Sequence, residues 1–209
     1  MIWYSDILTE QAIETLSSYY TLDNFQSGNH SNPDTSVKQN LMMKYEVPYQ
    51  KASKYLGDQI RKHEDFYHVN LIEKTSQYYF SWYRENHYYD WHIDNYPCAG
   101  VYADMSMTIF LNDDYDSGEL VIKVGDCETS HKPKPGTAVM YNTGLWHKVN
   151  KVTRGDRKVI ILWIESTIKD PFIRSHAREL GKIVRSINGK QMLELEQQRI
   201  NLIRQYGRY

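Results

Sequence analysis

The chain has 209 residues, enough for one sizeable core, and its 25 Lys and Arg nearly balance 26 Asp and Glu, for a net charge of -1. This balance excludes a general electrostatic attraction to nucleic acid or to an anionic membrane. No apolar run approaches the roughly 20 residues of a membrane span, and the start, MIWYSDILTE, lacks the pattern of a signal peptide, so we expect a cytoplasmic protein.

The two cysteines, Cys98 and Cys127, form no CxxC motif. In a reducing compartment, such cysteines usually act as small buried hydrophobic residues. We therefore favour this interpretation over a disulfide or a zinc site.

Helical patterns stand at both ends of the chain and strand patterns stand between them. The spacing of apolar residues predicts a helix within residues 8–20, beginning after Thr9 as its N-cap, and a second helix over 47–66. Two more helices are expected over 172–187 and 190–206. Short β-rich runs separated by turn residues predict strands at 77–83, 89–94, 105–111, 118–124, 137–142, 145–150 and 157–165.

Many short strands flanked by helices predict a mainly β fold, a sandwich or a barrel with N- and C-terminal helices. We expect a single domain over residues 1–209, with a barrel at about 77–166 and helical buttresses at about 9–65 and 171–206, since no linker or repeat interrupts the chain.

The stretch YRENHYYDWHIDNYP contains His92 and Asp94, which share a face if this run is a strand. His147, in TGLWHKVN, is the best candidate for a third ligand. Two histidines and a carboxylate on one face of a metal are the arrangement of non-heme Fe(II) oxygenases. A lone HxD is more often structural. A second HxD at His63 is rejected because residues i and i+2 diverge by about 200° on a helix.

Arg157 follows His147 by ten positions, across the turn TRGD. A hairpin pairing residues 149–151 with 157–159 through a three-residue loop would bring Arg157 onto the face of His147. This geometry predicts a positive φ at Gly155, Arg157 pointing into the barrel and Arg154 pointing to solvent. Arg157 could then bind a dicarboxylate bidentately, although a solvated hairpin arginine is the alternative interpretation.

These residues resemble the 2-oxoglutarate and Fe(II)-dependent dioxygenases, which carry HxD, a distal His and a basic residue about ten positions on. More narrowly, YRENHYYDWHIDN, MSMTIFLNDDYDSGEL and GLWHKVNKVTRGDRKVIILWIES are similar to the PKHD-type hydroxylases, relatives of prolyl 4-hydroxylases. VKQN at 37–40 and the C-terminal RINLIRQY extend the similarity, which covers most of the chain.

The resemblance implies a double-stranded β-helix, a jelly-roll or cupin-like barrel, with Fe(II) held by His92, Asp94 and His147 and 2-oxoglutarate held by Arg157. It further implies that Tyr83, and more weakly Tyr89, help to bind the cosubstrate. Phe110 stands where some relatives carry another cosubstrate tyrosine, so that hydrogen bond is either absent or supplied elsewhere, with Tyr102 and Thr108 as candidates.

The implied reaction uses O2 to decarboxylate 2-oxoglutarate to succinate and to hydroxylate an organic substrate, with ascorbate as the expected reductant. The retained Asp94 favours hydroxylation, since related halogenases replace this carboxylate with a small residue. A prolyl residue in a peptide or protein is the target that kinship suggests. The rings of Tyr88, Trp91, Tyr96 and Trp146 could line a substrate entrance or belong to the core.

Two other classes of function stay open. A cupin-like module could bind a metal or a small acid without turnover, but it gives no reason for Arg157. A dioxygenase acting on a small molecule or a nucleobase is the second alternative, although the near-zero charge argues against a groove that follows phosphates. The short basic cluster HKPKP at 131–135 is typical of a solvated turn.

Overall fold

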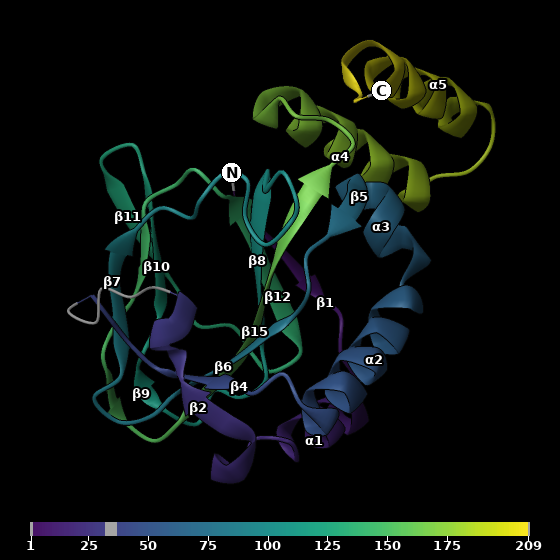
Figure 1. Cartoon of the computed structure of the whole chain (residues 1–209). Helices are drawn as coiled ribbons and strands as arrows, with labels where there is room; N and C mark the ends of the chain where they lie inside the picture. Colours follow the sequence, from purple (N-terminus) through teal and green to yellow (C-terminus); the bar gives the residue numbers. More distant parts are fainter. Residues whose placement is uncertain (1, 32–36, 209) are drawn as a thin grey trace.

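Two antiparallel sheets form the centre of the computed structural model, which describes residues 2–31 and 37–208 (Figure 1). The larger sheet follows the order β1 (Ile2–Asp6), β12 (Thr137–Asn142), β8 (Met105–Phe110), β15 (Arg157–Ser166), β6 (Tyr79–Tyr83), β4 (Leu41–Met43) and β2 (Phe25–Ser27), with β5 (Ile72–Thr75) also paired to β15. The smaller sheet follows the order β11 (Cys127–His131), β10 (Leu120–Val124), β13 (His147–Val149), β7 (Tyr88–His92) and β3 (Lys38–Gln39). A short pair joins β14 (Val152–Arg154) to β9 (Asp116–Ser117).

The central strand β8 lies between β12 and β15, and all of its residues are buried. Its two faces meet different partners, because Met107 and Ile109 pack into the larger core whereas Phe110 packs into a smaller one. Burial on both faces explains why MSMTIF does not alternate between apolar and charged residues.

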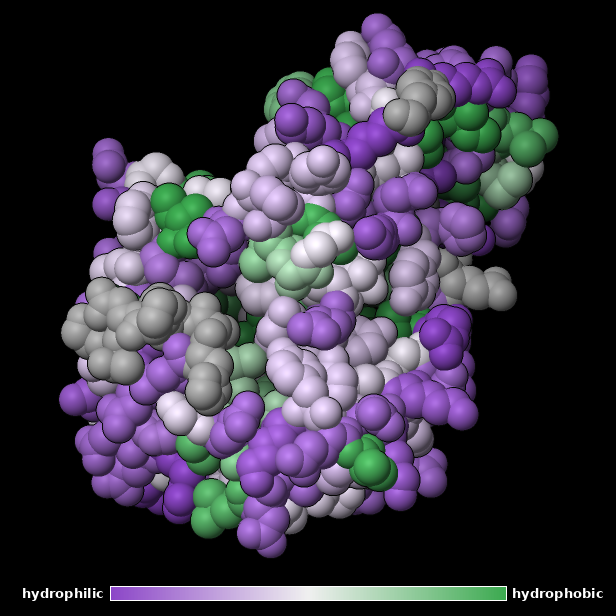
Figure 2. All heavy atoms as spheres, viewed as in Figure 1, coloured by the Kyte–Doolittle hydropathy of each residue, from purple (hydrophilic) through white to green (hydrophobic). Residues whose placement is uncertain are grey.

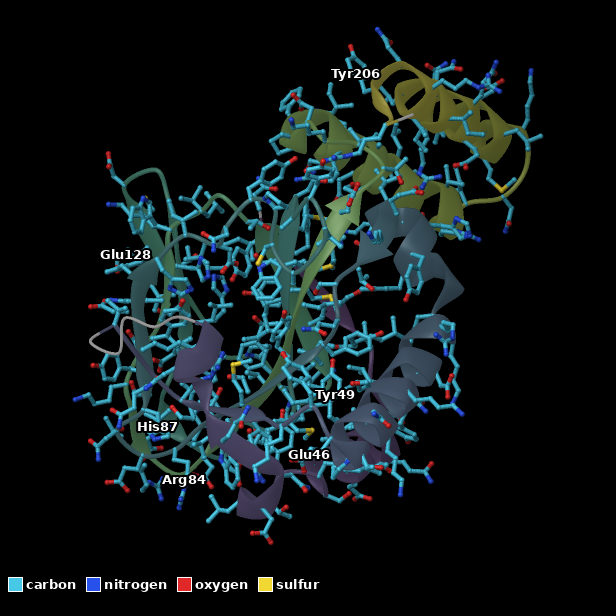
Figure 3. The ribbon with its side chains drawn as sticks, viewed as in Figure 1. Glu46, Tyr49, Arg84, His87, Glu128 and Tyr206 are labelled. Atoms are coloured by element: carbon cyan, nitrogen blue, oxygen red, sulfur yellow. The ribbon has the colours of Figure 1, made fainter. Side chains whose placement is uncertain are left out.

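Three helices, α1 (Glu10–Ser17), α2 (Val47–Arg61) and α3 (Glu64–Asn70), accompany the larger sheet (Figure 1). The predicted Thr9 cap is confirmed, since its side chain accepts a hydrogen bond from the Ala12 amide. Tyr49 lies on α2 (Figure 3). Its ring meets that of Phe80 of β6 edge to face, with ring centroids 5.9 Å apart.

The hydrophobic side chains form two main clusters. The larger core includes Leu16 and Leu56 from the helices and Phe80 and Ile160 from the larger sheet. The smaller core combines side chains of both sheets: Tyr83, Phe110, Val139, Tyr141 and Val159 from the larger one and Leu120, Ile122 and Val149 from the smaller one. The smaller core therefore holds the two sheets together next to the candidate site.

The C-terminal helices α4 (Pro171–Ser186) and α5 (Lys190–Tyr206) pack on each other at one end of the sandwich (Figure 1). Hydrophobic side chains, among them Phe172 and Leu193, stay exposed on this pair (Figure 2). After α5 the chain returns to the sheets, where Arg208 binds both carboxylate oxygens of Asp104. Both oxygens accept from the same atom, Nη2 of Arg208, and this contact ties the segment after α5 to the residue that precedes β8.

The predicted hairpin before Arg157 is wrong. Strand β13 pairs with β10 and β7 in the smaller sheet, whereas β15 pairs Arg157 with Tyr83 in the larger sheet. The connecting segment β14 pairs with β9 instead of β15. Two details of the prediction are nevertheless confirmed, because Gly155 has φ +79° and Arg154 is exposed, paired with Asp116. The chain thus changes sheets between residues 149 and 157.

Three further expectations need correction. The helix predicted over 47–66 breaks after Arg61 into α2 and α3. Cys98 and Cys127 are free, as expected, but Cys98 is only half-buried and Cys127 is exposed on the β10–β11 hairpin. Eight strands were not predicted: β1, β2, β3, β4, β5, β9, β11 and β14.

The described part of the chain contains no helix long and apolar enough to span a membrane.

Candidate metal centre and cosubstrate pocket

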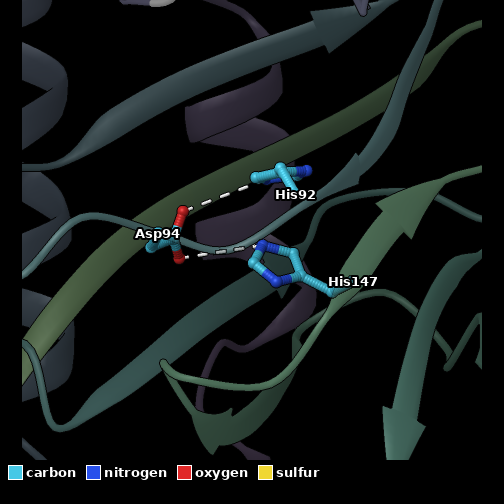
Figure 4. Close-up of side chains that lie close together, drawn as sticks. All are labelled: His92, Asp94 and His147. Carbon is cyan, nitrogen blue, oxygen red and sulfur yellow. Dashed lines mark ion pairs between the residues drawn. The ribbon is translucent and has the colours of Figure 1, made fainter.

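Three side chains with metal-binding atoms converge between the sheets: His92, Asp94 and His147 (Figure 4). Their potential ligand atoms all lie within 4.8 Å of one another, with His92 Nε2 3.9 Å from Asp94 Oδ1 and His147 Nε2 3.7 Å from Asp94 Oδ2. Among the side chains that the structure describes, this is the only such group of three or more His, Cys, Asp or Glu.

The strands bring the two histidines together, since His147 on β13 is the cross-strand partner of His92 on β7. Asp94 reaches them differently from the expectation, because β7 ends at His92 and Asp94 lies in the loop that follows. The carboxylate is therefore positioned by the path of the loop and by its hydrogen bonds, not by the alternation of a strand.

Both imidazole rings have a defined tautomer. His92 Nδ1 lies 2.8 Å from the Asp90 carbonyl oxygen, and His147 Nδ1 lies 2.9 Å from that of Leu145. A carbonyl oxygen only accepts, so each Nδ1 carries a proton, and Nε2 is the ring atom that faces Asp94 and could bind a metal. Burial, and secondly the neighbouring His147, lowers the pKa of His92 to about 4, which keeps its ring neutral near pH 7.

Two donors fix the Asp94 carboxylate. Trp163 Nε1 and Ser106 Oγ each donate to Asp94 Oδ2 at 2.8 Å. Ser106 also contacts Thr143 Oγ1 at 3.1 Å, and the Thr143 amide donates to the backbone carbonyl of Asp104. Neither Trp163 nor Ser106 was predicted as part of the site. The sequence alone could have indicated Trp163, because it lies six positions after Arg157 on the same predicted strand (163 − 157). Side chains an even number of positions apart on a strand point to the same face.

Arg157 lines the same cavity from the larger sheet, and only 1% of its surface is exposed. Its guanidinium carbon stands 5.0 Å from the ring centroid of Tyr83 and 5.2 Å from that of Phe110. Its Nε and Nη1 atoms have no hydrogen-bond partner among the described residues. Buried donors without acceptors are unfavourable, so this guanidinium fits a site for an anion.

Tyr83 and Tyr89, the other residues expected to bind the cosubstrate, lie beside Arg157 and His92 respectively. Tyr83 is buried beside Arg157, and burial raises the pKa of its hydroxyl to about 12, against the effect of Arg157. Tyr89 stacks on His92, with ring centroids 3.5 Å apart and an interplanar angle of 12°. Of the two residues expected to replace the hydroxyl missing at Phe110, Thr108 lines the cavity whereas Tyr102 is 52% exposed.

The cavity between the sheets has a volume of about 330 Å³, enough for a small organic acid beside a metal ion. Lys38 and Tyr141, which sequence reasoning missed, also line it. Burial lowers the pKa of Lys38 to about 8, and the attraction of Asp94 opposes this shift. Because β3 has only two residues, the sequence shows no alternation of apolar and polar residues there from which an inward-pointing Lys38 could be predicted.

The four rings considered for a substrate entrance do not line this cavity, and none of them belongs to the buried core. Tyr96 and Trp146 are about half exposed, at 53% and 50%. The rejected His63 lies between α2 and α3, away from the triad. Arg84 and His87 stand at the turn between β6 and β7 (Figure 3).

The donor set fits the metal and the acid that the sequence predicts. Two imidazoles and one carboxylate on one side of a cavity suit Fe(II) with open coordination positions. The buried, unpartnered donors of Arg157 suit the far carboxylate of a dicarboxylic acid.

Comparison with known proteins agrees with this geometry. Residues 76–165 match the family model described as the 2OG-Fe(II) oxygenase superfamily. A PKHD-type hydroxylase from Sphingopyxis alaskensis is 32% identical over 190 residues, which cover 88% of this chain and 87% of the relative. Another from Picosynechococcus is 32% identical over 186 residues, covering 87% of this chain and 85% of the relative.

Solved structures with a similar fold include a Pseudomonas putida prolyl-4-hydroxylase, with a TM-score of 0.59 and 16% identity over 79% of this chain and 92% of that one. A Trichoplax adhaerens prolyl hydroxylase in complex with a hypoxia inducible factor peptide gives a TM-score of 0.62 and 16% identity, covering 79% of this chain and 83% of that one. The predicted double-stranded β-helix with flanking helices is thereby confirmed.

Proposed function

Because the chain belongs to the PKHD-type hydroxylases of the 2OG-Fe(II) oxygenase superfamily, we propose that it couples the decarboxylation of 2-oxoglutarate to the hydroxylation of an organic substrate. In this proposal His92, Asp94 and His147 hold Fe(II). Arg157, with Tyr83 beside it, binds the far carboxylate of 2-oxoglutarate, and Tyr89 orients His92 by stacking on it.

One observation carries the proposal: a His-Asp-His group and a buried arginine, whose Nε and Nη1 have no partner among the described residues, line one cavity from opposite sheets. A triad alone would also suit a module that binds a metal without turnover. The guanidinium adds a reason for an acid to bind at a defined distance from the metal, which such a module does not need.

When bound, iron and 2-oxoglutarate supply the activation of O2 and the transfer of oxygen to the substrate. The protein's own groups orient and enclose them. Asp90 and Leu145 hold the two imidazoles through Nδ1. Trp163 and Ser106 hold the Asp94 carboxylate. Burial of Arg157 keeps water from competing with the acid.

For the primary substrate we propose a prolyl residue in a peptide or protein. This rests on the similar fold of two prolyl hydroxylases, one of them in complex with a peptide. A small molecule or a nucleobase is the alternative. We further propose that residues 1–209 act as one catalytic domain and that ascorbate serves as reductant.

The test is succinate formation by purified protein that contains Fe(II), with 2-oxoglutarate and O2, each omitted in turn. Succinate that requires all three supports an oxygenase, whereas tight metal and acid binding without succinate would favour the cupin-like module. Candidate proline-containing proteins are then added, and a gain in mass of one oxygen atom at a proline supports the prolyl assignment. Oxygen gained only by a small molecule or a nucleobase contradicts it.

A further inference from the structure

Three side chains form a row across the inner face of the larger sheet, where it meets the triad. They are Tyr141 of β12, Ser106 of β8 and Trp163 of β15, and Ser106 is the cross-strand partner of both others. Cross-strand partners share a face of the sheet. Ser106 and Trp163 both donate to Asp94 Oδ2. The row that contains Tyr141 is therefore the one that positions the proposed carboxylate ligand.

Tyr141 completes this row beside one of the two histidines. Its ring meets that of His147 edge-on, with ring centroids 5.1 Å apart, and only 3% of its surface is exposed. The residue also lines the cavity. Arg157 lies six positions before Trp163 on β15 (163 − 157), roughly 20 Å along the strand at 3.3 Å per residue. Tyr141 thus stands at the metal end of the cavity, and Arg157 enters it from the other end.

The Tyr141 hydroxyl is not required to orient Ser106, although it can reach that residue. The single proton of Ser106 goes to Asp94, so the hydroxyl of Thr143, 3.1 Å away, donates to Ser106 Oγ. This contact already orients Ser106. A phenylalanine at position 141 would pack against His147 without bringing a hydroxyl into a buried place. The hydroxyl of Tyr141 is thus suited to a ligand that enters the cavity.

We propose that the Tyr141 hydroxyl donates a hydrogen bond to the carboxylate beside the oxo group of 2-oxoglutarate. A phenol carries its proton near pH 7, and a carboxylate is the acceptor with which it forms a strong, charge-assisted hydrogen bond. This inference rests on the proposed function and adds a residue that binds the cosubstrate at the metal end. Each end of the acid then has a tyrosine, Tyr141 near the triad and Tyr83 beside Arg157.

The experiment separates the two ends of the acid by means of a shorter one. Pyruvate has the same 2-oxo carboxylate group as 2-oxoglutarate but lacks the far carboxylate that Arg157 is proposed to bind. Both acids are titrated in a calorimeter into protein loaded with Zn²⁺, which has no redox chemistry, so binding is measured without turnover. A change that affects both acids acts at the metal end, and a change that affects only 2-oxoglutarate acts at the far end.

Tyr141→Phe keeps the ring that meets His147, so only the hydroxyl is lost. It should weaken the binding of 2-oxoglutarate and of pyruvate by the same factor, about tenfold. Tyr83→Phe is the matched control, because it removes a hydroxyl from the same cavity beside Arg157. It should leave the affinity for pyruvate unchanged. Thermal melting checks that both variants fold, and titration of Zn²⁺ into metal-free protein should give Tyr141→Phe the affinity of the wild type.

Several results would overturn the inference. An unchanged affinity of Tyr141→Phe for both acids would show that the hydroxyl does not bind the cosubstrate, and weaker binding of 2-oxoglutarate alone would place it at the far end. Weaker binding of Zn²⁺ with unchanged binding of both acids would mean that Tyr141 acts through Ser106 on Asp94. Absence of pyruvate binding by the wild type, even at high millimolar concentration, would also contradict it. The proposed function fails separately, as absence of succinate formation by a wild type that binds both acids.

Discussion

His147 and Arg157 are ten positions apart in the chain (157 − 147) and face one cavity from two different sheets. His147 stands on β13 beside His92, and Arg157 stands on β15 beside Tyr83. The segment between them leaves one sheet, pairs briefly with β9 and enters the other. The spacing is thus the length of chain needed to cross the sandwich.

Replacement of His92, Asp94 or His147 by Ala should lower the affinity for Zn²⁺ or Fe(II) at least a hundredfold, because each removes one of three ligands. Calorimetric titration of the metal measures this. His63→Ala is the control, since His63 lies outside the triad. Tight metal binding by His92→Ala together with its loss in His63→Ala would mean that the site is elsewhere.

Arg157→Ala should raise the concentration of 2-oxoglutarate needed for half-maximal succinate formation by roughly a hundredfold, since loss of a buried charge partner costs about 3 kcal/mol. Arg154→Ala should change it little, because Arg154 is exposed and pairs with Asp116 at the surface. An unchanged requirement in Arg157→Ala would exclude this residue from the cosubstrate pocket.

Trp163→Phe should weaken metal binding about tenfold, because it removes a donor that orients Asp94 while keeping an aromatic ring in place. Trp82→Phe is a matched control, since the buried Nε1 of Trp82 has no hydrogen-bond partner among the described residues. The ratio of the two metal affinities, each corrected for stability by thermal melting, gives the contribution of the hydrogen bond. Equal affinities would show that Ser106 suffices to orient the carboxylate.

Gly155→Val should weaken 2-oxoglutarate binding without altering any predicted ligand. Gly155 has φ +79°, which a β-branched residue resists, and a Cβ there would stand 3.0 Å from the Asp114 carbonyl oxygen. Because Gly155 lies two residues before Arg157, this strain is expected to shift the arginine that binds the acid. Gly144→Val, where a Cβ meets nothing within 4 Å, should bind the acid normally. Titration of 2-oxoglutarate into the Zn²⁺ forms compares them, and equal affinities would contradict the expectation.

Arg208→Ala should destabilise the protein by about 1–3 kcal/mol, because Asp104, whose side chain is 5% exposed, loses the Nη2 donor shared by its two carboxylate oxygens. Lys190→Ala, on α5, should have little effect, since its pair with Glu194 is exposed. Urea unfolding measures both. Equal stability of the two variants would show that the contact at Asp104 contributes nothing.

The central strands and the long helices could be predicted because their patterns are local. Strands β8, β12 and β15 and helices α4 and α5 begin and end within two residues of the predicted limits. The edge strands β2 and β3 could not, since their three and two residues are too few to show a period. The five-residue edge strands β1 and β11 were missed as well.

The residues of the candidate site were predicted from their types and spacing. The strand alternation and the hairpin that were expected to bring them together are not what the structure shows. Asp94 was placed on a strand face, whereas hydrogen bonds from Trp163 and Ser106 position it in a loop. Arg157 was placed by a hairpin, whereas the chain crosses between sheets. Lys38 escaped prediction because its position depends on a pairing with Tyr89, 51 residues away (89 − 38), that no local pattern reveals.

The smaller core lies between the sheet that carries the triad and the sheet that carries Arg157. Its thickness therefore sets how long a dicarboxylic acid can be and still reach both. Val159→Ala, which would let the sheets approach, should shift preference toward the shorter oxaloacetate, and Val149→Leu, which would separate them, toward the longer 2-oxoadipate. In this architecture, selectivity for the length of an acid is expected to depend on the hydrophobic side chains packed between the sheets as well as on the groups that bind its charged ends.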